Sequence, residues 1–330
     1  MTYSLGWSVL RQVEVTRERW PGGEWRTALP LVTLGQHVLP DQPVMRLLRS
    51  KPIPQSSYAP YAPYNNMHAY ERQSEQSIGE EITTIPAGLS GRVVDVTKRG
   101  GVIIESRVAA VLGELGAGRQ VVGMLTLWPG EHAPRDVIPP GAILIVPGPL
   151  NLGLLNQALV SNIQGVVASS MTLPDLEGFL HADMLQLLTT PNTEMAQEHL
   201  PPLTLLLTEG IGQRPMPKHT LSLLQRYQGS LALLSGATSI STKVWPELLI
   251  PLPTQEARSW HPEQPVYTLS PGAVVRICGG EYNGEIGVIE ALMSYQQRFP
   301  CGIRARSICV CLEKSNRRVI VPTALVERIG

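Results

Sequence analysis

Residues 269–290 read LSPGAVVRICGGEYNGEIGVIE, and they are the most informative stretch of the chain. Strand residues alternate between two faces, so Val275 and Ile277 share one face and the residues on either side of them share the other. Gly284 supplies a tight turn, and Gly287 lets the returning strand bend over a small core. The stretch therefore predicts two antiparallel strands that begin a small β-barrel.

The glycines of this stretch match the pattern of a known family. In the KOW motif of transcription elongation factors and ribosomal proteins, a glycine precedes an alternating strand, and a Gly-x-aromatic-x-Gly turn is followed by x-x-Gly-x-Val. Gly280, Tyr282, Gly284 and Gly287 occupy those places, so the segment resembles a KOW-type SH3-like barrel. The resemblance implies a small partner-docking β-barrel at residues 268–330. Its later elements are expected at residues 303–312, 318–322 and 324–329.

The C-terminal segment carries a local surplus of positive charge. The whole chain is neutral, with 27 Lys and Arg against 27 Asp and Glu, so it exerts no long-range attraction on a polyanion. From residue 270 onward there are eight basic and five acidic side chains, and phosphate contacts need such cations. Barrels of the KOW type bind RNA, ribosomal partners or polymerase, several bind only protein, and an ordinary solvated strand face would show a similar surplus. The candidate nucleic-acid-binding residues are Arg276, Tyr282, Arg304, Arg306, Arg317 and Arg318.

Residues 1–135 are predicted to be β-rich, because short apolar or alternating runs are separated by Gly or Pro. GQHVLPDQPVMRL at residues 35–47 and PAGLSGRVVDV at residues 86–96 resemble the strand pairs of barrel-sandwich hybrid domains, the fold of lipoyl and biotinyl carriers. In carriers, a lysine at the hairpin between the two halves bears the cofactor, and Lys51 falls near that place. A long loop at residues 52–80, with the near-repeat YAPYAPY, replaces the tight hairpin, so no cofactor is expected. This loop or extended arm could instead dock a partner.

Residues 140–255 switch to a pattern of apolar strands separated by helices. Helical apolar spacing follows Leu150, and further helices are predicted near Leu173 and Pro217. Runs of this kind are typical of a parallel sheet with both faces covered. The predicted strands are residues 141–147, 165–169, 203–208 and 230–235.

In open parallel sheets, ligands bind beside the carboxyl ends of the strands. The third predicted strand ends in TEGIGQR at residues 208–214, where two glycines free the backbone and two charged side chains could meet a polar ligand. A turn that needs glycine conformations, fixed by an Arg–Glu pair, explains the same residues. The candidate ligand-binding residues are Glu209, Gly210, Gly212 and Arg214.

Length and composition indicate a multidomain globular chain. At 330 residues, with 43% hydrophobic and 16% charged residues, roughly two or three domains with packed cores are expected. The start of the chain has no apolar signal-peptide region, and prolines and asparagines break the most apolar stretch, residues 142–160. A cytoplasmic protein without membrane contact is therefore expected. All four cysteines lie beyond residue 277 at irregular spacing, which favours reduced thiols over disulfides or a metal site.

These patterns together predict a multidomain α+β protein. No Walker or Gly-x-Ser-x-Gly sequence is present, so the enzyme question stays open with a non-enzymatic role favoured. The predicted function is a binding or scaffold protein whose KOW-like barrel docks nucleic acid, a ribonucleoprotein or a protein partner. The alternative is a small-molecule-binding or enzymatic α/β domain with its site at residues 208–214, and homo-oligomeric assembly is a third possibility. The predicted parts are a barrel-sandwich-like domain (1–135), an α/β parallel-sheet domain (140–255), a linker (256–267) and a small β-barrel (268–330).

Overall fold

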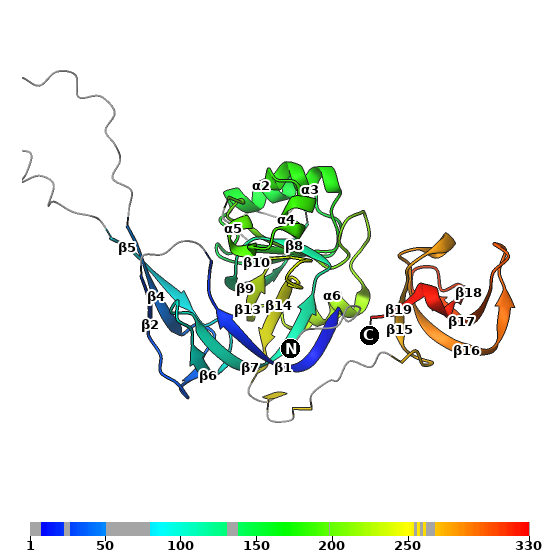
Figure 1. Ribbon diagram of the computed structural model, residues 1–330, viewed down its shortest axis with the longest axis horizontal. Coiled ribbons are helices and arrows are strands. Elements are labelled where there is room, and N and C mark those ends of the chain that lie inside the picture. Colours follow the sequence, from blue (N-terminus) through cyan, green and yellow to red (C-terminus); the bar gives the residue numbers. More distant parts are fainter. Residues whose placement is uncertain are drawn as a thin grey trace, which may run out of the picture.

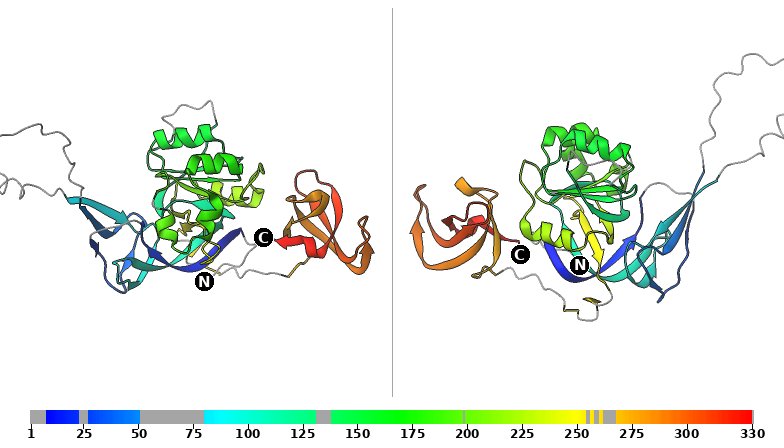
Figure 2. Two further views of the ribbon diagram at one scale, coloured as in Figure 1. Left: turned by 45° about the horizontal axis from the view of Figure 1, so that its top comes forward. Right: turned by 180° about the vertical axis from the view of Figure 1, so that it is seen from behind.

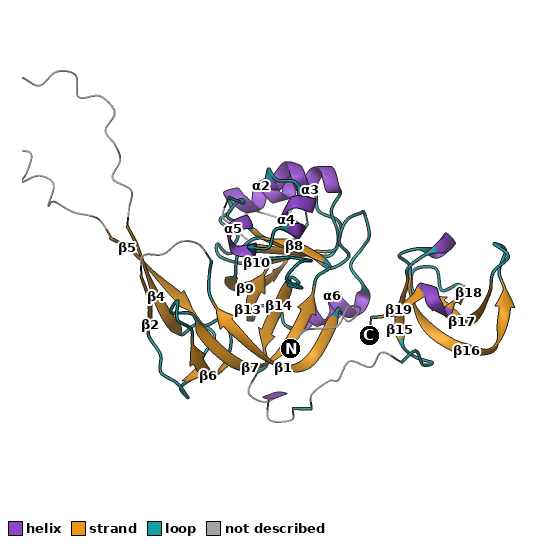
Figure 3. Ribbon diagram, viewed as in Figure 1, coloured by secondary structure: helices purple, strands orange, loops and turns teal. Residues whose placement is uncertain are grey.

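The computed structural model describes residues 8–22, 27–50, 80–130, 138–197, 199–253, 256–257, 260–261 and 268–329. Its strands form sheets of eleven, three and five strands, and most of its helices gather on the central part (Figures 1 and 3). None of the helices in these residues is long and apolar enough to cross a membrane. Lys51, nearly all of the predicted loop 52–80 and most of the linker 256–267 lie outside the described residues.

The N-terminal part is built around two long antiparallel strands. β1 (Val9–Arg19) pairs with β7 (Val102–Leu112), and β6 (Gly91–Val96) pairs with the first half of β7. Alternate residues of each strand point inward and form one apolar core, so the β-rich character predicted for this segment is confirmed. β3 (His37–Val38) extends the large sheet, and β2 (Thr27–Pro30), β4 (Pro43–Ser50) and β5 (Glu80–Pro86) make the separate three-stranded sheet.

The central part holds a mixed sheet instead of the predicted parallel one. Three of the four predicted strands are parallel, and they are joined by a fourth parallel strand from the segment predicted as N-terminal. These strands are β9 (Val121–Leu127), β10 (Ile143–Val146), β11 (Gly165–Ala168) and β12 (Thr204–Leu207). The antiparallel strands of this part are β8 (Leu115–Ala117), β13 (Leu231–Ser235) and β14 (Glu247–Pro251).

The run at residues 230–235 is not the parallel strand that the sequence predicts, because β13 runs antiparallel to β9. The chain leaves β12 at its carboxyl end, forms helix α6 (Lys218–Arg226) and rejoins the sheet at the carboxyl half of β9. There the Gly229 N–H donates to the Leu125 carbonyl oxygen at 2.8 Å. A parallel neighbour needs a full crossover to the opposite edge, which this segment does not make.

Helices cover both faces of the central sheet (Figure 1). Leu144 and Val146 of β10 pack in a core with the helices that follow the strand. Ile143 and Ile145 alternate to the other face, where Leu224 of α6 packs in a second core. The helices on the first side are α2 (Leu152–Val160), α3 (Leu173–Leu180), α4 (Met184–Thr189) and α5 (Thr193–Ala196).

The N-terminal and central parts share one sheet. The second half of β7 pairs with β14, so the eleven-stranded sheet passes from the N-terminal strands into the central ones (Figure 2). The predicted boundary near residue 135 falls between β9 and β10, which are hydrogen-bonded neighbours. Backbone hydrogen bonds therefore hold these two parts together.

Residues 268–329 form a five-stranded antiparallel sheet around its own core (Figure 1). Its elements are β15 (Val274–Ile277), η2 (Gly280–Tyr282), β16 (Ile286–Arg298), β17 (Arg304–Leu312), β18 (Arg318–Pro322), η3 (Thr323–Leu325) and β19 (Val326–Arg328). The predicted strand–turn–strand is present, with Val275 and Ile277 fully buried and Gly284 at φ +83°. The closed barrel is not formed, because β18 and β19 lie at opposite edges of the sheet.

Candidate nucleic-acid interface

Two sites that the sequence predicts separately meet in the structure. Arg276 of β15 is 6% exposed, and its Nη2 lies 3.1 Å from both carboxylate oxygens of Glu209, which follows β12. Its Nη1 contacts the carboxylate of Glu114, which lies between β7 and β8. Arg276 is a predicted phosphate contact, yet two carboxylates of the central part already neutralise it. The structure therefore gives that role no support.

The Arg276–Glu209 pair is buried, which affects both charges. Burial lowers the pKa of Arg276 and raises the pKa of Glu209, because both charged forms lose contact with water. Buried ion pairs are tolerated only where close contacts offset this desolvation, as the two contacts of Nη2 do here. The pair therefore holds the C-terminal sheet against the central sheet.

The predicted ligand loop, residues 208–214, forms the rest of this contact. A Cβ placed on Gly284 would lie 2.8 Å from Nε of Arg214, so this guanidinium packs directly on the turn of the C-terminal sheet. Gly210 and Gly212 both have positive φ, as a glycine turn requires. The loop joins two parts of the protein, which favours the turn interpretation over a small-molecule site.

Three other candidates lie at or near the end of β17 that leads into β18, and they already have partners. The Cζ of Arg317 is 5.9 Å from the centroid of the Tyr282 ring, so the two side chains lie against each other. Arg318 pairs with Glu290 at 2.8 Å on an exposed face. The Arg317 contact uses a face of Tyr282 that a base would otherwise stack on. These side chains are less available to a polyanion than the sequence alone indicates.

The remaining candidates, Arg304 and Arg306, lie at the other end of β17. Arg304 is directly opposite Arg298 of β16 and Arg306 is opposite Gln296, and facing residues of an antiparallel pair project to the same side. Gln296, Arg298, Arg304 and Arg306 are all exposed and form one surface, here called the hairpin face. Among the described residues, none of these three arginines has an ion-pair partner. Figure 1 shows the hairpin on the side of the C-terminal sheet that points away from the central sheet.

The hairpin face is cationic and lies in a segment without acids. Residues 291–312 contain no Asp or Glu. Tyr295 and Ile303, each 63% exposed, belong to the same hairpin, but they directly precede Gln296 and Arg304, so strand alternation does not place them on the hairpin face. Arg298 is not among the residues that the sequence predicts, because only its cross-strand register with Arg304 reveals that the two share a side.

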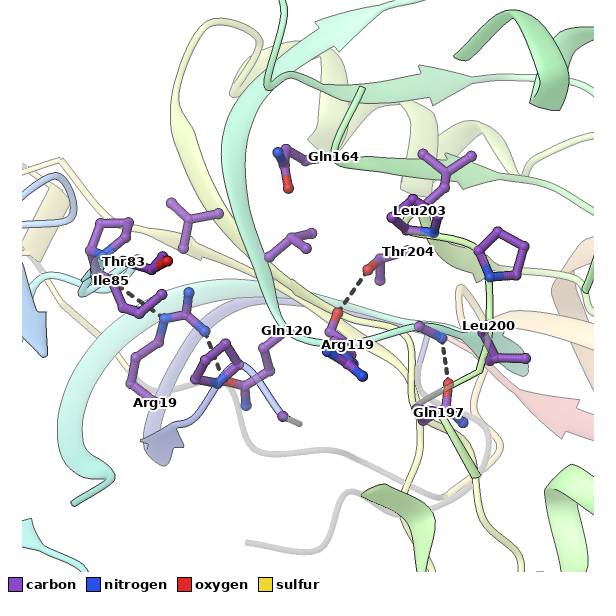
Figure 4. Close-up of a pocket in the computed structure, with 18 of the residues that line it drawn as sticks. Arg19, Thr83, Ile85, Arg119, Gln120, Gln164, Gln197, Leu200, Leu203 and Thr204 are labelled. Atoms are coloured by element: carbon purple, nitrogen blue, oxygen red, sulfur yellow. Dashed lines mark hydrogen bonds between the residues drawn. The ribbon is translucent and has the colours of Figure 1, made fainter. Parts of the chain in front are cut away.

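A cavity of about 830 Å³ lies away from both predicted sites (Figure 4). Val121, Gln164 and Thr204 line it at the amino ends of β9, β11 and β12, whereas the general rule for parallel sheets directs attention to the carboxyl ends. Arg19, the last residue of β1, lines it from the N-terminal part. No sequence motif indicates this cavity.

Comparison of the chain with known protein families, curated protein sequences and solved structures finds no match. The resemblances to KOW-type barrels and to barrel-sandwich hybrid domains therefore stay predictions from residue patterns.

Proposed function

We propose that the protein is a non-enzymatic nucleic-acid-binding protein that contacts the phosphate backbone through the hairpin face. One observation carries the proposal: Arg298, Arg304 and Arg306 lie side by side on one side of a two-stranded hairpin without an acidic neighbour in residues 291–312. The KOW-like pattern of residues 269–290 supports the same role, since the family it resembles includes RNA-binding members.

The spacing of the three guanidinium groups suits a polyanion. Like charges directly opposite each other in a sheet repel, so the Arg298–Arg304 pair destabilises the hairpin until an anion neutralises it. Arg304 and Arg306 are two residues apart on one strand face, so their Cα atoms are separated by roughly 7 Å. Guanidinium groups bind phosphate in a planar, two-pronged manner, which makes arginine well suited to such contacts. Tyr295 directly precedes Gln296 in the hairpin, and its exposed ring offers a surface beside the hairpin face on which an unpaired base could stack.

Fluorescence anisotropy with labelled single-stranded RNA, single-stranded DNA and duplex DNA tests the proposal on the full chain. Each phosphate contact to a single strand lowers the slope of log K against log salt by about 0.7, so three contacts predict a slope near −2. The triple variant Arg298→Gln, Arg304→Gln and Arg306→Gln should lose most of this slope and most of the affinity.

The matched control is the double variant Arg317→Gln and Arg318→Gln, which removes arginines from the same domain that already have protein partners. It should bind nearly as well as the wild type. Equal losses in control and triple variant would mean that only general charge matters. Absence of binding at about 50 mM salt would reject the nucleic-acid role and leave protein docking, which a nuclease-treated pull-down would then examine.

A further inference from the structure

We propose that the cavity between β5 and the amino ends of β9, β11 and β12 binds a small organic anion, and that Arg19 holds its carboxylate or phosphate group. The site is independent of the hairpin face, because the described residues that line the cavity all come from the N-terminal and central parts. It is also distinct from the loop 208–214, which contributes no residue to the cavity wall.

Arg19 is a buried charge whose protein partners are neutral. Its side chain is 2% exposed, its Nε donates to the Pro86 carbonyl oxygen at 3.0 Å, and its Nη1 donates to Oε1 of Gln120 at 3.1 Å. No carboxylate of a described residue lies within ion-pair distance of it. A buried charge without a counter-ion is costly, so the site is incomplete without an anion.

Two other arginines that are largely shielded from water both have carboxylate partners. Arg17 precedes Arg19 by two residues on β1, and its Nε and Nη2 lie 2.7 and 2.9 Å from the two carboxylate oxygens of Glu247. Arg276 is likewise buried, and it contacts Glu209 and Glu114. Arg19 differs from both because its described partners are neutral, and it is also the one of the three arginines that lines the cavity.

The geometry leaves one nitrogen of Arg19 for a ligand. Nε and Nη1 each donate one hydrogen bond to the protein, whereas Nη2 makes no hydrogen bond to a described residue, and Figure 4 shows the guanidinium at the cavity wall. Gln120 positions it, since its Oε1 accepts from Arg19 and from the Trp20 N–H while its Nε2 donates to the Glu18 carbonyl oxygen. Burial lowers the pKa of Arg19 only to about 10, so the group stays charged at neutral pH.

The remaining walls describe the ligand. The cavity volume of about 830 Å³ lies within the range typical of small-molecule sites. None of the described lining residues is acidic, and a second arginine, Arg119, lines the same space. Gln197 uses its Oε1 to accept from the Gly118 N–H at 2.5 Å, which leaves its amide nitrogen as a donor. The ligand should carry an apolar body beside its oxyanion, because apolar side chains complete the wall. These side chains are Ile85, Val121, Val122, Leu200 and Leu203.

Calorimetry and thermal unfolding of the full chain, at ionic strength held constant with sodium chloride, test this inference with three probes. Benzoate carries a carboxylate on an apolar body, phenyl phosphate carries a phosphate on the same body, and inorganic phosphate lacks the body. At least one of the two aromatic probes should bind at one per chain and raise Tm by about 5 °C at a hundredfold excess over Kd. The stronger of the two identifies the oxyanion, and weaker binding of inorganic phosphate would confirm the contribution of the apolar wall.

Arg19→Gln should weaken the Kd of the bound probe by about tenfold or more, as expected for loss of a charged hydrogen bond. The control is Arg92→Gln, which removes an exposed arginine of β6 paired with Glu105 and should leave binding unchanged. If Arg19→Gln fails to fold, Gln164→Trp is the second variant, since Gln164 is exposed at the cavity edge and a tryptophan there should block binding. Two results would overturn the inference. One is that neither aromatic probe binds the wild type more strongly than sodium chloride does at the same ionic strength. The other is that Arg19→Gln binds the probe as tightly as the wild type.

Discussion

His219 lies on α6 beside the start of β1, where its Nε2 is 3.3 Å from the Ser8 hydroxyl. Burial, with a smaller contribution from the charge of Arg11, lowers the pKa of His219 to about 4. The unfolded chain takes up a proton near pH 6.5, so acidification favours the unfolded state from that point down to about pH 4. Above pH 6.5 the histidine is neutral in both states and makes no pH-dependent contribution.

We therefore expect the free energy of unfolding to fall by up to about 3 kcal/mol between pH 6.5 and pH 4 because of this one residue. In the variant His219→Gln this part of the loss should disappear, so its stability should fall less steeply with acid than that of the wild type. Urea unfolding across this pH range measures the difference. Parallel curves for the two proteins would show that His219 is already accessible to protons in the folded state.

Arg17 and Arg19 show what a sequence can reveal at the scale of single residues. β1 reads VLRQVEVTRER, and its alternation places Arg17 and Arg19 on the same side as Val13 and Val15. That pattern indicates two inward-facing charges near the end of a strand. It does not indicate whether a partner is present, because Glu247 meets Arg17 from more than two hundred residues away while Arg19 meets only neutral groups.

At the scale of elements, most strands of the central and C-terminal parts follow from apolar runs and glycine turns. Their pairing does not follow as readily. The run that forms β13 looks like those that form β10 and β11, yet it is antiparallel because the segment after β12 returns at the same end of the sheet. Local sequence specifies that a segment is extended, whereas the neighbour and direction depend on connections far along the chain.

Gly287 provides a test at this scale, since β16 and β17 approach each other closely there. A Cβ on Gly287 would lie 2.4 Å from the Cys311 carbonyl oxygen and 2.5 Å from Cγ1 of Val310. We expect Gly287→Ala to destabilise the C-terminal sheet by about 2 kcal/mol, because the strands must move apart. Thermal unfolding and near-UV circular dichroism measure the loss. The control is Ala305→Val on the same strand pair, at a half-buried position where the change should stay within about 0.5 kcal/mol, and equal effects would contradict the close-approach argument.

At the scale of the whole molecule, the turn of the C-terminal sheet and the loop 208–214 are parts of one contact. The sequence presents them as two separate candidate sites, each with charged residues and glycines. Their union cannot be predicted from local patterns, because Arg276 is 67 residues from Glu209 and 162 residues from Glu114 along the chain. Only the placement of three separate segments shows that these charges neutralise one another.

The Arg276–Glu209 contact leads to a prediction about how the C-terminal sheet is held against the central part. Arg276→Gln leaves the Glu209 carboxylate, whose side chain is 1% exposed, without its partner, and an unpaired buried charge is strongly unfavourable. The protein can relieve this by exposing the loop 208–214 to water. Above about pH 8, where Glu209 is ionised, hydrogen exchange of peptides that cover this loop should therefore be faster in the variant, while exchange in strands β17 and β18 stays unchanged.

The double variant Arg276→Gln with Glu209→Gln tests whether the effect comes from the unpaired charge of Glu209 or from the smaller side chain at position 276. It replaces the buried ion pair by two neutral amides, so exchange of the loop should return most of the way to the wild-type rate. Since burial raises the pKa of Glu209 to about 8, lowering the pH from about 9 to about 7 should also slow the loop of the single variant, relative to the intrinsic exchange rate, as the carboxyl takes up a proton. The double variant should lack this pH response. Unaltered exchange of the loop in Arg276→Gln would instead mean that the other contacts, such as Arg214 against Gly284, hold the two parts together without the ion pair.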